Sequence, residues 1–176
     1  ACSAECGQQG LAGQHFSLTG TGSFSTTTVR TGVRSFRVNP TLGAAYWETF
    51  VLGSVLVRVF RIYVRFTTLP TLTCVVTSTF HSSVPGAYFN ATDSKLYAGY
   101  LNVTAQLGAT GIAVTTGVWY RVDVKIDSSA NPWTIDIQVD GVAAGQNTNA
   151  VAALDNNQIV LGIFGFSPTA DIFYDD

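Results

Sequence analysis

Charged residues are scarce in this chain of 176 residues. Only nine Lys and Arg and 11 Asp and Glu are present, so 11% of the residues are charged and 47% are apolar. Soluble domains usually carry about 25% charged residues, and disordered chains are poor in apolar ones. The formal net charge of −2 offers no electrostatic attraction to nucleic acid or anionic lipid. We therefore expect a folded protein without a nucleic-acid partner.

Long apolar runs are also missing. The most hydrophobic stretch, VLGSVLVRVF, is interrupted by Arg58 and falls short of the ~18 apolar residues that a membrane-spanning helix needs. No linker, low-complexity tract or internal repeat divides the sequence. We expect one domain covering residues 1–176 and no membrane span.

Methionine is absent, even at position 1, so Ala1 is either a processed N-terminus or the start of a fragment. The three cysteines leave one thiol over, whether Cys2 pairs with Cys6 or one of them pairs with Cys74. The C-x-x-C spacing of zinc sites is missing, and Cys74 in LTCVVT is interpreted as a small buried residue. The candidate disulfide between Cys2 and Cys6 and the missing methionine favour an extracellular protein.

No segment has a sustained helical period with caps, whereas alternation with a period of two dominates the sequence. It covers residues 60–66, 118–126 and 134–140, and in each the apolar side chains fall on one face and the polar ones on the other. Turn-forming stretches such as TTLPT, ATDSK, DSSANPW and VDGVAAG lie between the predicted strands. The sequence therefore predicts an all-β protein, an antiparallel sandwich or barrel.

Five stretches in a fixed order suggest a family. They are SAECG, VRTGVRSFRV, RIYVRFTTLP, the hairpin GVWYRVDVKID…WTIDIQVDG, and IVLGIFGF…ADIFYDD. Their order and spacing resemble the laminin-G-like branch of the concanavalin-A-like lectin/glucanase jelly roll. The resemblance implies a two-sheet antiparallel β-sandwich in which the first and last strands pair. Asp-Gly at the end of the hairpin independently predicts a turn with positive φ.

The resemblance also implies a structural calcium where the first and last strands meet. An acidic residue from each end would bind it, here Glu5 with Asp175 or Asp176, together with backbone carbonyls. Oxygen ligands from separate segments suit Ca²⁺, which tolerates irregular geometry. Alternation puts Asp175 and Asp176 on opposite faces of a strand, so solvated strand-end carboxylates are the alternative interpretation.

Catalytic patterns are missing. Glycosidases need two carboxyl groups at a set separation, but only Glu5 and Glu48 are glutamates and no E-x-D-x-x-E pattern occurs. The remaining acidic pairs, Asp136/Asp140 and Asp171/Asp175, fit polar strand faces. The two histidines stand in no G-x-S-x-G context, and no nucleotide-binding motif is present. The sequence therefore predicts a protein that is not an enzyme.

A binding face is the more promising feature. Arg61, Tyr63 and Arg65 share the outward face of one predicted strand, and Trp119 and Arg121 share that of another. An aromatic ring between guanidinium groups can stack on a sugar and hold its hydroxyls or a carboxylate. The alternative is that these side chains pack under a loop or extend along the sheet.

Two function classes follow. The first is a non-catalytic extracellular module that decorates or attaches a virus particle or cell-surface assembly and is a candidate glycan binder. Its partner would be a glycan, a surface-assembly protein or a second copy of the chain. The second is a carbohydrate-active enzyme of the glucanase or lyase type, or its detached carbohydrate-binding module. The jelly roll hosts both classes, so the fold does not decide between them.

Overall fold

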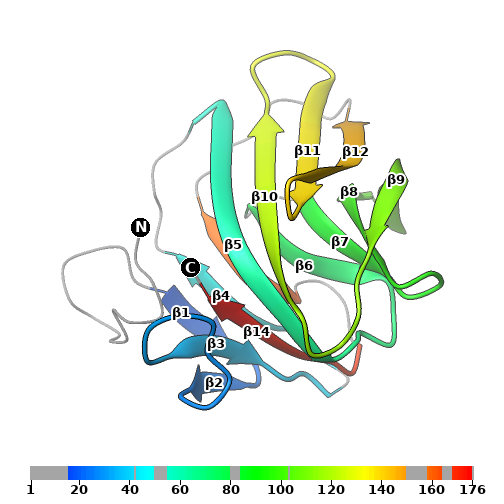
Figure 1. Cartoon of the computed structure of the whole chain (residues 1–176). Coiled ribbons are helices and arrows are strands. Elements are labelled where there is room, and N and C mark those ends of the chain that lie inside the picture. Colours follow the sequence, from blue (N-terminus) through cyan, green and yellow to red (C-terminus); the bar gives the residue numbers. More distant parts are fainter. Residues whose placement is uncertain are drawn as a thin grey trace.

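A computed structural model describes residues 16–41, 43–49, 55–79, 84–102, 104–149, 158–163 and 168–175. These residues form two seven-stranded antiparallel sheets packed as a sandwich, without a helix (Figure 1). Sheet A consists, in the order of its neighbouring strands, of β1 (Phe16–Thr19), β4 (Ala45–Thr49), β13 (Ile159–Ile163), β6 (Cys74–Thr79), β7 (Gly86–Asn90), β8 (Lys95–Asn102) and β9 (Thr104–Ala113). Sheet B consists of β12 (Val142–Asn149), β11 (Trp133–Val139), β10 (Trp119–Asp127), β5 (Val57–Thr68), β14 (Asp171–Asp175), β3 (Ser35–Val38) and β2 (Gly22–Ser25). The predicted all-β sandwich is confirmed.

The period-two alternation decides which side chains enter the core. In β5, β10 and β11 the apolar set faces sheet A and is buried, with Phe60 and Tyr120 only partly so. The polar set between them faces outward, as the sequence predicts. Each fully buried large apolar side chain stabilises the fold by about 1.5–3 kcal/mol, so a register slip by one residue would expose the whole set.

The core between the sheets is closed by contacts that cross it. The Phe66 ring of sheet B lies 5.8 Å, centroid to centroid, from the Phe89 ring of sheet A. The Tyr174 hydroxyl on β14 donates to the Val76 carbonyl on β6 over 2.9 Å. Burial raises the pKa of Tyr174, so its phenol stays protonated and able to donate.

The hairpin of β11 and β12 has the turn that the sequence predicts. Val139 pairs with Val142, and Asp140 and Gly141 between them have φ of 51° and 82°. Two consecutive positive φ values are typical of a type I′ turn, which Asp-Gly favours because glycine has no Cβ to clash. The Asp140 carboxylate accepts the Arg121 N–H at 2.8 Å and thereby joins the turn to β10.

The expected pairing of the first and last strands is wrong for the described strands. β14 lies between β5 and β3 in sheet B, whereas β1 pairs with β4 in sheet A. Ile172 and Tyr174 on β14 are fully buried. β14 is thus a central strand of sheet B, whereas β1 is an edge strand of sheet A, so the two cannot pair.

Cys74 is buried on β6, as its apolar surroundings in the sequence suggest. Burial raises the pKa of its thiol because the charged thiolate is disfavoured in an apolar environment. Cys2 and Cys6 lie outside the described residues, so the disulfide between them stays a prediction. In the described ranges no helix is long and apolar enough to cross a membrane.

Candidate functional site

The structure brings the five predicted binding residues together on the outer face of sheet B. β10 pairs antiparallel with β5 (Figure 1). The register places Trp119 opposite Arg65 and Arg121 opposite Tyr63. Residues directly opposite each other on neighbouring strands point to the same face. The same register places Asp123 opposite Arg61.

Asp123 organises the two guanidinium groups beside it. One carboxylate oxygen accepts from Arg61 Nε at 2.5 Å and the other from Arg121 Nε at 2.9 Å. The hydrogen bond with Asp123 raises the pKa of Arg61. Both bonds use the Nε atoms, so the terminal amino groups of each guanidinium are able to donate to a ligand. Sequence reasoning missed Asp123, because its role depends on the pairing of β5 with β10.

Arg65 and Tyr63 are engaged differently from Arg61. Arg65 Nε donates to the Gly117 carbonyl over 3.0 Å, and thus supports the turn before β10. The Arg30 guanidinium lies 3.4 Å from the centroid of the Tyr63 ring, a cation–π contact. One face of the Tyr63 ring is therefore covered by the loop between β2 and β3.

Asp175 fixes this loop. Its side chain is almost fully buried, and Oδ2 accepts the N–H groups of Arg30 and Thr31 over 2.8 and 3.2 Å. The other two candidate calcium ligands, Glu5 and Asp176, lie outside the described residues. Within the described ranges no group of three His, Cys, Asp or Glu side chains could hold a metal ion. The calcium site stays a prediction.

A groove of about 570 Å³ opens on this face over β5, β10, β11 and β12. Its polar lining consists of Arg61, Arg121, Asp123, Lys125, Asp136, Gln138 and Gln146. Many of these side chains are already paired: Gln146 Nε2 donates to Asp136 Oδ1 over 2.8 Å, and Lys125 Nζ lies 3.3 Å from Asp127 Oδ2. With Asp127 included, three cations stand against three carboxylates, so the groove is close to neutral. It offers many fixed donors and acceptors and little net charge.

The acidic pairs considered from the sequence are held by separate partners. Asp136 lies in the groove with Gln146, whereas Asp140 is part of the hairpin turn. Asp171 is bound by Arg37, and Asp175 by the loop. His15 and His81 lie outside the described residues, and the side chain of Glu48 is not among those described.

Comparisons with known proteins extend this picture. No family model and no curated protein matches the chain. Among solved structures, the alginate lyase Aly36B superposes with a TM-score of 0.59 at 13% identity, over 82% of this chain and 80% of that one. The carbohydrate-binding module CBM66 from Bacillus subtilis gives a TM-score of 0.57 at 8% identity, over 92% of this chain and 95% of that one.

A third similar structure is domain 4 of AbnA, a GH43 extracellular arabinanase from Geobacillus stearothermophilus, in complex with arabinotriose. It gives a TM-score of 0.56 at 14% identity, over 92% of this chain and 82% of that one. At such low identities the likeness concerns the fold alone. The chain therefore has the β-sandwich fold of these carbohydrate-associated proteins.

Proposed function

We propose that this chain is a non-catalytic, extracellular carbohydrate-binding module, and that it binds a neutral oligosaccharide in the groove on the outer face of sheet B. The observation that carries the proposal is the Arg61–Asp123–Arg121 triplet, whose hydrogen bonds fix two guanidinium groups at the groove. Fixed donors lose little conformational entropy on binding, which favours recognition of hydroxyl groups.

The balance of charge sets the class of sugar. Asp123 and the neighbouring carboxylates offset the three cations of the groove, so a uronic acid gains little long-range attraction. Neutral sugars need both donors and acceptors, and the groove supplies both through Arg, Gln and Asp side chains. We therefore expect a neutral oligosaccharide to bind more tightly than an acidic one.

The non-catalytic assignment is supported by the partners of the carboxylates. Each oxygen of Asp123 accepts from an arginine, and Asp136 accepts from Gln146. Glycosidases work with two carboxyl groups at a set separation, whereas these two carboxylates serve as hydrogen-bond acceptors for Arg61, Arg121 and Gln146. None of the three neighbours described above is a virion or laminin-G protein, so we prefer the carbohydrate-binding module to a surface-decorating one.

The test is calorimetric titration with arabinotriose and with an alginate trisaccharide, the oligosaccharides held by an AbnA domain 4 structure and an Aly36B mutant structure. Arabinotriose is expected to bind more tightly. Arg61→Ala and Arg121→Ala should weaken binding at least about tenfold, since a hydrogen bond to a charged group contributes about 1.5–3 kcal/mol. Lys95→Ala is the matched control, because Lys95 is a carboxylate-paired cation on sheet A.

Two results would contradict the proposal. If the wild type and both arginine variants bound with equal affinity, the groove would be excluded as the binding site. Release of unsaturated or reducing ends from alginate or arabinan by the purified protein would show that it is an enzyme.

A further inference from the structure

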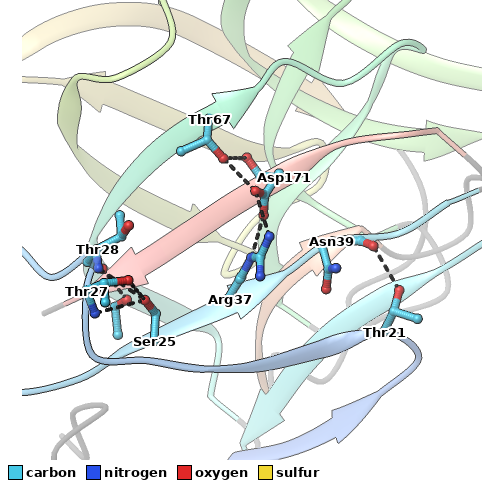
Figure 2. Close-up of polar contacts among 9 residues, drawn as sticks. Thr21, Ser25, Thr27, Thr28, Arg37, Asn39, Thr67 and Asp171 are labelled. Carbon is cyan, nitrogen blue, oxygen red and sulfur yellow. Dashed lines mark hydrogen bonds and ion pairs between the residues drawn. The ribbon is translucent and has the colours of Figure 1, made fainter.

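A second recess lies on the same outer face of sheet B, beyond the groove. It has a volume of about 480 Å³ and spans β2, β3, β14 and the end of β5. Its polar lining consists of Ser23, Ser25, Thr26, Thr27, Thr28, Arg37, Thr67 and Asp171. Figure 2 shows most of these side chains. They come from β2, β3, β5, β14 and the loop that follows β2. A volume of this size falls within the ~300–1,000 Å³ typical of small-molecule sites.

The charged pair in this recess is held by three hydrogen bonds. Arg37 donates from Nε and from its Nη2 amino group to the two oxygens of Asp171 over 2.8 and 3.0 Å. The Thr67 hydroxyl donates to Asp171 Oδ2 over 2.7 Å (Figure 2). The side chains of Arg37 and Asp171 remain 37% and 20% exposed, so a ligand can still reach both. The two charges cancel, and the pair attracts neither anions nor cations.

Hydroxyl groups form the opposite wall. Ser25 Oγ accepts the Thr28 N–H over 3.1 Å and lies 3.4 Å from Thr27 Oγ1 (Figure 2). The Ser35 hydroxyl donates to the Thr28 carbonyl over 2.6 Å and joins this turn to β3. The Ser25 and Thr27 hydroxyls are thus in contact with each other before any ligand arrives.

The recess is separate from the groove. The recess spans β2 to β5 and the groove spans β5 to β12 in the strand order of sheet B. Their centres are about three strands apart, or roughly 14 Å at ~4.8 Å per strand. Between them the Arg30 guanidinium lies over the Tyr63 ring, and no residue lines both the recess and the groove.

We infer that this recess is a second sugar-binding site, independent of the groove, which takes one neutral sugar unit through the Arg37–Asp171 pair and the surrounding hydroxyls. The ligand class follows from the chemistry of the lining. The lining has no net charge to attract an ionic ligand, and donors beside acceptors match vicinal hydroxyls. The inference extends the proposed function, but it is carried by residues that do not line the groove.

The experiment is a titration of the wild type with arabinotriose, followed by amide chemical shifts. We expect two separate groups of shifting amides, one in β10 and β11 and one around Thr27, Arg37 and Thr67. Arg37→Gln should weaken binding at the recess at least about tenfold and leave the groove affinity unchanged. Thr67→Val provides a milder change, because it removes one exposed hydroxyl without disturbing the core, and should weaken the recess several-fold.

The outcomes separate this inference from the proposed function. Recess shifts that persist in Arg61→Ala, when the groove shifts are lost, support two independent sites. Shifts confined to the groove in the wild type overturn the recess and leave the proposed function intact. Shifts confined to the recess contradict the groove as a binding site and support the recess as one. An unchanged recess affinity in both Arg37→Gln and Thr67→Val also overturns the inference.

Discussion

The two outer faces of the sandwich have opposite chemistry. The outer face of sheet A carries a second apolar cluster, in which Val75, Val84 and Tyr88 are buried and Leu101 and Leu107 pack against them. The outer face of sheet B carries the ion pairs of Arg61, Arg121 and Asp123 and of Arg37 and Asp171, together with both hollows. Both inner faces contribute to the same core.

This difference separates stability from binding. An apolar outer face stabilises the fold only while it is covered, so substitutions there change the free energy of unfolding. Exposed ion pairs contribute little to stability, yet they hold donors and acceptors where a ligand can reach them. We therefore expect substitutions in the apolar cluster on the outer face of sheet A to destabilise the protein, and substitutions of the exposed charged residues on the outer face of sheet B to change ligand affinity.

The largest effect is expected for Tyr88→Ala. This change removes a fully buried ring and its hydrogen bond to the Val84 carbonyl, which is 2.7 Å long. Truncation of a buried aromatic side chain costs about 3–5 kcal/mol, measurable by equilibrium unfolding in urea. Arg61→Ala on the opposite face is the control and should leave the midpoint unchanged. Equal midpoints for both variants would contradict the separation of the two faces.

Calcium is expected to have the next largest effect, if it binds as the sequence predicts at Glu5, Asp175 and Asp176. A ligand specific for the folded state stabilises it by about 2.7 kcal/mol at a hundred times Kd. For a domain of this size, the melting temperature would rise by about 5–10 °C. Thermal unfolding in millimolar Ca²⁺ and in chelator measures the shift, with Asp176→Asn as the variant. An unchanged wild-type melting temperature would rule out the metal.

A smaller effect is expected for Asp175→Ala, which removes the acceptor of two backbone N–H groups. The amides of Arg30 and Thr31 would lose their bonds of 2.8 and 3.2 Å, and a typical hydrogen bond contributes about 0.5–1.5 kcal/mol. Hydrogen exchange at these two amides should accelerate, whereas exchange in β11 should keep its relative protection. Unchanged exchange at both amides would show that Asp175 does not fix the loop.

The smallest effect concerns Asp127 at the end of β10. The Ser129 hydroxyl and N–H both donate to Asp127 Oδ1, and these bonds lower the pKa of Asp127 from its ordinary value of 3.8. The ionised carboxylate therefore stabilises the fold at pH values above its ordinary pKa. This contribution is lost as the pH falls through the lowered pKa of the folded protein. Ser129→Ala should raise the pKa of Asp127 in a carbon-detected titration. The same titration curve in wild type and variant would refute this assignment.

The local alternation of apolar and polar residues predicted the strands that bury one face and expose the other. The alternation in β5, β10 and β11 and the turn at Asp140 and Gly141 are properties of short segments, so the sequence suffices for them. In contrast, β6 is buried along its whole length, because its outer face is also covered, and it shows no alternation that could reveal which face is inward.

Contacts between distant segments could not be predicted in the same way. Arg37 and Asp171 are 134 positions apart, and they meet only because β14 lies beside β3. Likewise, Arg30 reaches Tyr63 because Asp175 holds its loop. The five residues predicted for binding were placed correctly on one face, but their partners Asp123 and Arg30 depend on strand order, which the family resemblance predicted incorrectly for β14.

The central claim is that ligand binding belongs to the outer face of sheet B. Mapping amide chemical shifts over the whole protein during titration with arabinotriose tests it most directly. The account predicts shifts in β5, β10, β11 and β12 around Arg61, Asp123 and Gln146, and none around Tyr88 or Leu107 on sheet A. Shifts concentrated on the outer face of sheet A, with β5 and β10 unaffected, would contradict it.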